Sequence, residues 1–318
     1  MKINDEKFFN KKRVFVTGGT GFIGSHLIKQ LSRMGAIIGT YVHSRPSEYE
    51  IIAGSLATES PDRLYAKLID FRPDIVFHLA ANPLVNYAKE ELTDTFGINV
   101  IGTFNLFQAC KKVPSIQSIV HVATDKVYGN IPVITSRSIP NGVQHPYNAT
   151  KLCGDILSQM FSSTFELPVV VVRNGNIYGD GDLHFERIVP RTIKRVSAGK
   201  SPIIRGDGSS LRDYIHVDDI VIGYLNASDC GWGKTHSTIL NLGSDYPIKV
   251  SEVVDCVLKH TGRIDLVPEY EPSLLQNEIP NQHISDDDSG RKIGWKPNID
   301  LDSGMELTVR WYKENLYD

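Results

Sequence analysis

A glycine-rich segment near the N-terminus limits the fold of this chain more than any other feature. The segment Thr17-Gly18-Gly19-Thr20-Gly21-Phe22-Ile23-Gly24 lies between an apolar run typical of a strand (Arg13–Val16) and an amphipathic run typical of a helix (Phe22–Met34). A backbone without Cβ atoms can turn tightly and approach a pyrophosphate, and the N–H groups that begin the next helix point at the phosphates. In this context the pattern predicts a dinucleotide-binding loop, with contacts from Gly18, Gly21, Phe22, Ile23 and Gly24.

Short apolar runs alternate with longer amphipathic runs through the first half of the chain. They predict further strands at Ala36–Val42, Ile51–Gly54, Asp74–Ala80, Ser118–Ala123 and Pro168–Arg173. They predict further helices at Pro61–Phe71, Thr93–Lys112 and Pro146–Phe165. Apolar strands without polar alternation suit a parallel sheet that is covered on both faces. The predicted fold class is therefore α/β, a Rossmann-type doubly wound parallel sheet.

The pattern becomes less regular after Arg173, where Gly and Pro are frequent. The predicted helices in this half are Glu186–Ala198, Val217–Ala227, Val250–Thr261 and Asp302–Asn315. We expect residues 1–175 to form the dinucleotide-binding domain, rejoined by parts of 210–245. Residues 176–318 are expected to form mainly a smaller C-terminal α/β lobe, which binds substrate over the carboxyl edge of the sheet.

Composition and charge argue against several classes of protein. The net charge of −3 gives no electrostatic basis for binding nucleic acid or an anionic membrane, and no apolar run approaches the roughly 18 residues that span a bilayer. The polar segment Met1–Lys12 lacks the apolar stretch of a secretion signal. The cysteines form no CxxC pair, which is typical of reduced thiols in a cytoplasmic protein and predicts no metal site: Cys110, Cys153, Cys230 and Cys256.

The residues about 20 positions after the glycines usually select the cofactor. The segment Val42-His43-Ser44-Arg45 contains no acid that could bind the ribose hydroxyls. Arg45, helped by Ser44 and His43, is suited to bind a 2′-phosphate, which favours NADP over NAD. The alternative is that Arg45 is a solvated surface residue, and this leaves NAD open.

Tyr147 and Lys151 lie four residues apart in a predicted helix and therefore share one of its faces. A neighbouring ammonium favours the phenolate and lowers the pKa of a tyrosine. The phenolate can then take a proton from a substrate hydroxyl while hydride leaves the same carbon. Lys151 is also suited to hydrogen-bond the nicotinamide ribose. By itself this spacing is commonly a surface pair, but downstream of a nucleotide loop it predicts a catalytic pair.

Thr124, Asp125 and Lys126 directly follow the predicted strand Ser118–Ala123. Ligands of open α/β sheets bind at the carboxyl ends of the strands. A hydroxyl, an acid and a potential base at this place predict a reactive cluster. The alternative for Asp125 and Lys126 is a surface ion pair.

Together these motifs resemble the extended short-chain dehydrogenase/reductase family, within its NAD(P)-dependent nucleotide-sugar epimerases and dehydratases. The resemblance covers almost the whole chain. Besides the glycine loop and the Tyr147–Lys151 segment it is carried by Phe77-His78-Leu79-Ala80-Ala81, Asn99-Val100-Ile101-Gly102-Thr103, Arg173-Asn174-Gly175-Asn176-Ile177-Tyr178-Gly179, Gly206-Asp207-Gly208, Arg212-Asp213-Tyr214-Ile215-His216-Val217 and Gly294-Trp295-Lys296-Pro297.

Within this family the chain is most similar to the sugar-nucleotide 4,6-dehydratases, especially those of the CDP-glucose type. The triplet Thr124-Asp125-Lys126 is similar to that of CDP-glucose and UDP-N-acetylglucosamine 4,6-dehydratases, whereas simple 4-epimerases usually have small polar residues there. The resemblance implies oxidation of a nucleotide-diphosphate sugar at C4, loss of water across C5 and C6, and return of hydride to C6. The nucleotide base and the sugar stay open.

The resemblance also implies roles for individual residues. Tyr147 would deprotonate the C4 hydroxyl, Lys126 would remove the C5 proton, Asp125 would protonate the departing C6 hydroxyl and Thr124 would bind the C4 oxygen. Further cofactor contacts are expected from Leu79, Ala80, Ala81 and Asn99. Substrate contacts are expected from Asn82 and Asn176, and diphosphate contacts from Arg212 and, as further candidates, Arg187 and Arg191.

Other implications concern assembly and two histidines. Family members commonly dimerise through helices that correspond to Thr93–Lys112 and Pro146–Phe165, so we expect a homodimer. His78 and His216 are interpreted as structural residues, because His78 ends an apolar run and His216 lies within another.

Two other functions are compatible with parts of the pattern. A nucleotide-sugar 4-epimerase needs Tyr147 and Lys151 but neither Asp125 nor Lys126. A non-catalytic NADP-binding regulator would need none of these residues, and their joint presence argues against it.

Overall fold

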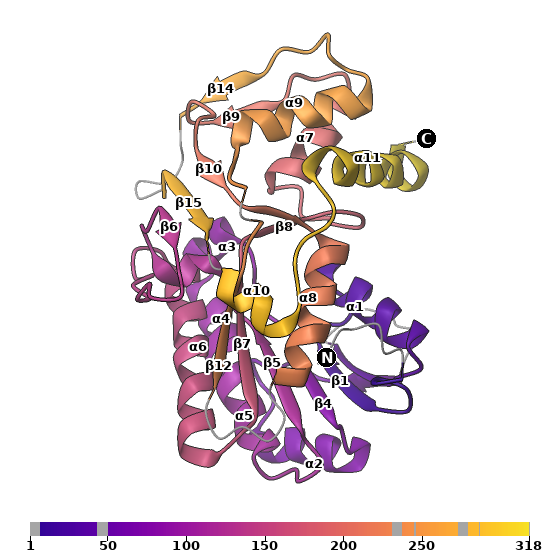
Figure 1. Cartoon of the computed structure of the whole chain (residues 1–318), viewed down its shortest axis with the longest axis vertical. Coiled ribbons are helices and arrows are strands. Elements are labelled where there is room, and N and C mark those ends of the chain that lie inside the picture. Colours follow the sequence, from indigo (N-terminus) through magenta and orange to yellow (C-terminus); the bar gives the residue numbers. More distant parts are fainter. Residues whose placement is uncertain are drawn as a thin grey trace.

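The first strand lies in the interior of a large parallel sheet. The computed structural model describes residues 7–42, 50–230, 237–244, 246–272, 279–285 and 287–317. Seven strands pair in parallel in the order β12-β7-β5-β4-β1-β2-β3, in the lower half of Figure 1. Their bounds are β1 Arg13–Thr17, β2 Ile37–Val42, β3 Glu50–Ala53, β4 Ile75–His78, β5 Ser118–Val122, β7 Val169–Asn174 and β12 Thr238–Leu242.

Helices cover both faces of this sheet, because alternate apolar residues of each strand point to opposite sides. Val14 and Val16 pack in one cluster with α1 and α8, and Phe15 packs in another with α2, α5 and α6. The bounds are α1 Phe22–Arg33, α2 Pro61–Phe71, α5 Thr103–Cys110, α6 Pro146–Phe165 and α8 Val217–Cys230. The helix α10 (Asp287–Ile293) packs against α8 and β12. The predicted fold class, a Rossmann-type doubly wound sheet, is confirmed.

The helix predicted over 93–112 differs from a regular helix in its middle. The chain forms two short helices, α3 (Val85–Glu90) and α4 (Leu92–Phe96), and then a π-helical turn at Gly97–Gly102 that continues into α5. A Cβ on Gly102 would lie 2.8 Å from Leu56 Cβ, so glycine lets this turn pack closely. The π-turn contains Asn99, one of the residues predicted for the site.

A second lobe lies above the carboxyl edge of the large sheet in Figure 1. Its four-stranded sheet has the order β13-β10-β15-β6, and two strand pairs, β11–β8 and β14–β9, accompany it. The strands are β6 Val133–Ile134, β8 Asn176–Tyr178, β9 Ile203–Arg205, β10 Leu211–Arg212, β11 Tyr214–His216, β13 Ile248–Lys249, β14 Glu269–Glu271 and β15 Asn281–Ile284. The helices α7 (Ile188–Ser197), α9 (Val250–Thr261) and α11 (Leu301–Tyr312) share a core, and a π-turn at Lys313–Tyr317 follows.

The two lobes exchange segments of chain. The strand β6 comes from the loop between β5 and α6, but it pairs with β15 of the second lobe. In the other direction, α8 and β12 belong to the core and the sheet of the first lobe, and both lie within residues 210–245. The predicted division near residue 175 remains a prediction. Among the described residues, no helix has the length and apolar character that crossing a membrane requires.

Candidate active site

The glycine loop lies where the order of the strands reverses. The chain passes from β1 to β2 on one side, while β4 lies on the other, which is the place where open α/β sheets bind ligands. Gly18 has φ +73°, and a Cβ there would lie 2.8 Å from the Ala80 nitrogen. A Cβ on Gly24 would collide with the Gly18 carbonyl. The loop therefore needs glycine at both positions.

The first turn of α1 is suited to bind an anion. Gly21 precedes the helix, no side chain caps it, and the first turn contains no acidic residue. The backbone N–H groups of Phe22 and Ile23 therefore have no partner within the helix, and they are suited to bind a phosphate that lies close to the loop backbone. These features fit a dinucleotide pyrophosphate. Ser44 and Arg45, on which the prediction of NADP depends, lie outside the described residues.

A buried hydrogen-bond chain holds the loop after β4. Thr17 Oγ1 lies 2.8 Å from His78 Nδ1, His78 Nε2 lies 2.9 Å from Thr103 Oγ1, and the Ala80 nitrogen donates to Thr17 Oγ1 at 3.2 Å. Burial lowers the pKa of His78 to about 3, and the charge of Lys151 acts in the same direction. His78 is therefore neutral and acts as a structural link, while Leu79, Ala80 and Ala81 follow it toward the glycine loop.

Asn99 connects this loop to the helix that carries the tyrosine. Its Oδ1 accepts a hydrogen bond from the Asn82 nitrogen at 2.8 Å, and its Nδ2 donates to Thr150 Oγ1 at 3.0 Å. Thr150 in turn donates to the Tyr147 carbonyl at 2.8 Å. Asn82 also donates to Thr95 at 3.2 Å. Asn99 is 3% exposed, so its side chain is a buried link between these elements.

Thr124, Asp125 and Lys126, which lie shortly after β5, form one connected cluster. Thr124 caps the turn Asp125–Tyr128. The Thr124 hydroxyl donates to Asp125 Oδ1 at 3.0 Å, and Lys126 Nζ lies 2.8 Å from Asp125 Oδ2. Asp125 is 1% exposed and Lys126 is partly exposed, so the carboxylate is buried against its own neighbours. This burial argues against a solvated surface ion pair.

Tyr147 adjoins this cluster from the first turn of α6, which begins at Pro146 and is capped by His145. Burial raises the pKa of Tyr147 to about 12; the charge of Arg187 and a hydrogen bond with Thr124 oppose this effect, and Asp125 adds to it. The sequence predicts the opposite direction, with Lys151 as the cation that lowers this pKa. In the structure Lys151 Nζ donates to the Val122 carbonyl at 2.7 Å, and burial lowers its own pKa to about 8. The cation that acts on the phenol is Arg187.

Except for Asn82, which follows β4, the predicted substrate residues lie in the second lobe. Arg187 lies at the start of α7 and pairs with the buried Asp182 at 3.0 Å. Arg191 follows one turn later, and its Nε is buried with no partner among the described residues. Burial lowers the pKa of Arg191, and the neighbouring Arg205 adds to this effect. An anion between the Arg191 and Arg205 guanidinium groups would offset both the burial of the charge and the repulsion between them.

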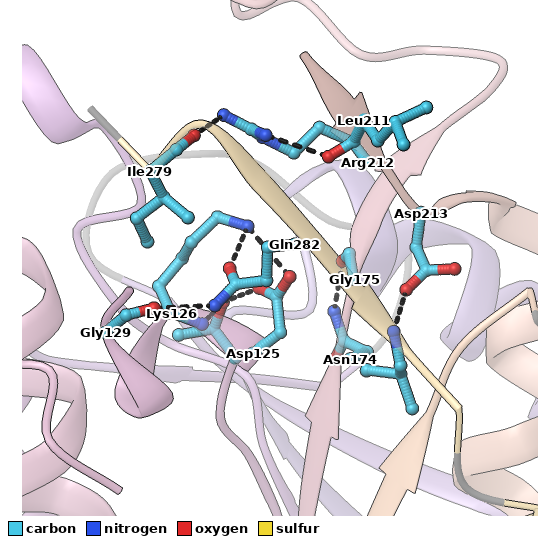
Figure 2. A network of polar contacts seen from close by, with 12 residues as sticks. Asp125, Lys126, Gly129, Asn174, Gly175, Leu211, Arg212, Asp213, Ile279 and Gln282 are labelled. Atoms are coloured by element: carbon cyan, nitrogen blue, oxygen red, sulfur yellow. Dashed lines mark hydrogen bonds and ion pairs between the residues drawn. The ribbon is translucent and has the colours of Figure 1, made fainter. Parts of the chain in front are cut away.

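Arg212 and Asn176 complete this set. Arg212 is 8% exposed and donates to the carbonyls of Leu211 and Pro280, at 2.8 and 2.9 Å, and to that of Ile279. Asn176 begins β8, whose backbone pairs with Tyr214 of β11. Arg212 pairs in register with Gln282, which contacts Lys126, and Figure 2 shows the three residues in one view.

Two sets of polar contacts at the site were not predicted from the sequence. Gln282 is fully buried and contacts Lys126 (Figure 2), although no local motif marks it. Beneath the site, Arg173 forms a buried two-bond ion pair with Asp155 at 2.7 and 3.0 Å and donates to the Tyr128 hydroxyl at 2.6 Å. Arg173 belongs to a quoted family segment, but its pairing depends on contacts distant in sequence.

One further group contains metal-ligand types. Donor atoms of Cys256, His260 and Asp302 lie within 4.8 Å of one another on α9 and α11. Asp302 Oδ1 contacts His260 Nε2 at 2.8 Å and Lys259 Nζ at 2.6 Å, so an ammonium already neutralises this carboxylate. This arrangement is explained as an ion-paired link between the two helices.

Comparisons with known proteins agree with the fold. A family model described as the NAD dependent epimerase/dehydratase family matches residues 14–243. The CDP-glucose 4,6-dehydratase of Salmonella typhimurium is 30% identical over 334 residues, which cover 97% of this chain and 92% of that protein. Among solved structures, MoeE5 in complex with UDP-glucuronic acid and NAD is 27% identical with a TM-score of 0.85, and the match covers 95% of this chain and 99% of its own.

A second solved structure represents the other reaction. The UDP-glucose 4-epimerase of Thermotoga maritima, solved with UDP-glucose, is 26% identical with a TM-score of 0.86 and the same coverage of 95% and 99%. The family description specifies NAD, and MoeE5 was solved with NAD. The predicted preference for NADP finds no support in these comparisons.

Proposed function

This chain belongs to the NAD-dependent epimerase/dehydratase family, and from that premise we propose that it is a nucleotide-sugar 4,6-dehydratase. The observation that carries the proposal is the ion pair of the buried Asp125 with Lys126, beside Tyr147. A 4-epimerase needs a tyrosine and a cofactor, whereas a dehydratase also needs an acid and a base. This pair would supply both, next to the tyrosine that would deprotonate the C4 hydroxyl.

The pair can supply acid and base together if one proton moves within it. Asp125 Oδ2 and Lys126 Nζ lie 2.8 Å apart, and transfer of a proton between them gives a carboxylic acid and an amine. The Lys126 amine then removes the C5 proton of the 4-ketosugar, and the C5–H electron pair becomes the C5–C6 double bond. As the C6–O bond breaks, Asp125 protonates the departing oxygen, which leaves as water.

Thr124 closes the proton cycle. When C6 is reduced, Lys126 returns its proton to C5, which leaves Asp125 one proton short and Tyr147 with the proton of the C4 hydroxyl. The Thr124 hydroxyl hydrogen-bonds Tyr147 and donates to Asp125 at 3.0 Å. A proton passed from Tyr147 through Thr124 to Asp125 restores the starting state. The same hydroxyl is suited to bind the C4 oxygen.

The cofactor in this proposal is NAD. The glycine loop and the first turn of α1 would hold its pyrophosphate, and Lys151 would hydrogen-bond the nicotinamide ribose. When bound, the nicotinamide supplies the hydride acceptor for C4 and the hydride donor for C6. The chain's own residues bind it, exclude water and move the protons.

The substrate would bind between the lobes. Arg187, Arg191 and Arg212 would contact the diphosphate, and Asn82 and Asn176 the rest of the substrate. We also propose a homodimer, because apolar side chains on the expected helices are exposed: Phe96, Ile101 and Ile156. The expected cytoplasmic location and the absence of nucleic-acid and membrane partners remain part of this proposal.

The test is a panel of CDP-, UDP-, dTDP- and GDP-glucose with NAD in heavy water. The expected product from one of them is a 4-keto-6-deoxy sugar nucleotide, which has lost the mass of one water and carries deuterium at C5. The Tyr147→Phe variant, which lacks the base for the C4 hydroxyl, is the control and should give no conversion. A product of unchanged mass would contradict the dehydratase proposal.

The second candidate is a nucleotide-sugar 4-epimerase. It is favoured by the match to the Thermotoga maritima enzyme and uses the same Tyr147, Lys151 and Thr124. The same panel separates the two, because an epimerase gives an isomer without loss of water.

A further inference from the structure

We propose that Gln282 is a positioning residue for Lys126. The amide oxygen of Gln282 holds the Lys126 nitrogen next to the C5 proton of the sugar. This inference rests on the proposed dehydratase reaction and adds a residue of the second lobe to its machinery. It concerns where the base lies, not the chemistry that the base performs.

The contacts of Gln282 define the direction of its amide. Its Oε1 accepts a hydrogen bond from Lys126 Nζ at 2.9 Å, and its Nε2 donates to the Gly129 carbonyl at 2.8 Å. Gly129 can only accept at this place, so the amide oxygen must face the lysine. Gln282 is fully buried, and Figure 2 shows its side chain between Gly129 and the tip of Lys126. A buried amide with both ends bound has little freedom to move.

The strand that carries Gln282 is fixed by two further residues. Arg212 of β10 pairs in register with Gln282 of β15, and its guanidinium donates to the Ile279 and Pro280 carbonyls just before that strand. Asp213, which directly follows β10, accepts a hydrogen bond from the Ile284 nitrogen at the end of β15. The backbone of β15 is therefore held on both sides of Gln282, by contacts that Figure 2 shows in part.

This contact matters most when the ion pair is lost. Before the reaction, charge attraction to Asp125 holds the Lys126 ammonium. Once the proton has moved to Asp125, that attraction disappears, and the neutral amine must turn its lone pair from Asp125 toward the C5 proton. An amine still donates N–H, so the hydrogen bond to Gln282 persists and keeps the nitrogen in place during this turn.

The test compares Gln282→Met, which keeps the side-chain length but removes both polar ends, with Asn281→Ala as a matched control. Asn281 lies next to Gln282 and accepts from the Leu211 nitrogen at 2.9 Å, so its loss loosens β15 without removing the contact to Lys126. With NAD and the sugar nucleotide, we expect Gln282→Met to slow deuterium exchange at C5 and product formation by about 10- to 100-fold. Oxidation at C4, followed by NADH absorbance in a single turnover, should be unchanged, and Asn281→Ala should keep both steps.

A second readout does not depend on activity. Acetic anhydride modifies free amines, and mass spectrometry gives the rate at Lys126. We expect Lys126 to react several-fold faster in Gln282→Met than in wild type or in Asn281→Ala. If the methionine variant does not fold, Gln282→Asn, which keeps a buried but shorter amide, should show the same split in a weaker form.

The outcomes separate this inference from the proposed function. A wild-type product that has lost no water contradicts the dehydratase itself. If wild type is a dehydratase, an unchanged C5 step in Gln282→Met overturns the positioning role. Equal losses at C4 and C5, or the same split in Asn281→Ala, would assign Gln282 a merely structural role and also overturn it.

Discussion

At the scale of single residues, Tyr147 and the Asp125–Lys126 pair have separate roles in the proposed reaction. Tyr147 adjoins the pair through Thr124, yet the two groups act on different carbons in the proposed reaction. Removing the acid should therefore stop the second half of the reaction and leave the first. This separation distinguishes a dehydratase from an epimerase within one family.

The corresponding prediction concerns Asp125→Asn. An amide cannot donate a proton to the departing C6 oxygen, so we expect product formation to fall by about 10²- to 10⁴-fold while C4 oxidation continues. Stopped-flow absorbance of NADH and mass spectrometry of the product measure the two steps. Asp62→Asn, at an exposed surface position, is the control and should behave as wild type. Wild-type turnover in Asp125→Asn would remove Asp125 from the mechanism.

At the scale of elements, the glycine loop and α1 act as one unit. A Cβ on Gly24 would meet the Gly18 carbonyl and lie 2.8 Å from Gly19 Cα, so the loop would have to open. We expect Gly24→Ala to weaken NAD binding by about tenfold or more, equivalent to at least about 1.4 kcal/mol, in titration calorimetry.

The matched control for this variant is Gly97→Ala. A Cβ there meets just the Ala57 Cβ, at an ordinary contact distance of 3.4 Å, in a helical position with φ −55°. Its NAD affinity should equal that of wild type. Equal affinity in Gly24→Ala would show that the nucleotide does not use this loop.

Much of the fold is predictable at this scale, because local patterns determine it. Three of the helices, α2, α6 and α9, begin and end at the predicted residues, and six of the seven strands of the large sheet lie within a few residues of their predicted places. The seventh strand, β12, was not predicted. Proline at the first turn and apolar periodicity are local signals. The short strands of the second lobe were not predicted, since two- and three-residue strands such as β10 have no periodicity of their own.

The residues of the site that lie in local motifs were predicted, whereas those that depend on contacts distant in sequence were not. Thr124, Asp125, Lys126 and Tyr147 follow local motifs, and the structure brings them together. Gln282 reaches Lys126 because β10 and β15 pair, and the pKa of Tyr147 depends on burial and on Arg187 from another lobe. Desolvation and long-range pairing leave no pattern in a short stretch of sequence.

At the scale of the whole molecule, two buried histidines make stability depend on pH. His78 and His121 stack with ring centroids 5.1 Å apart, and burial holds the pKa of His78 at about 3 and that of His121 well below its usual range. The unfolded chain binds a proton at each below about pH 6.5, whereas the folded chain does not. The contribution of these two histidines to the free energy of unfolding is therefore fully present above about pH 6.5 and is lost as the pH falls toward 3.

The measurement is the free energy of unfolding by urea between pH 8 and pH 4.5. Each histidine should contribute a decline of up to about 1.4 kcal/mol per pH unit below about pH 6.5. In His78→Asn the free energy of unfolding should decline less steeply with falling pH, by the contribution of one histidine. This difference in slope does not depend on the stability of the variant at pH 8. Parallel curves for wild type and variant would show that His78 is not held neutral in the folded protein.

The order of the strands also has a consequence for synthesis on the ribosome. The strand β7, with four buried valines in succession, ends at Asn174, but its neighbour β12 emerges roughly 70 residues later. At bacterial or eukaryotic elongation rates this gap lasts about 3 to 14 s. During this interval the nascent chain has an apolar strand with one unpaired edge, which is the kind of segment that chaperones bind and that aggregates when translation stalls.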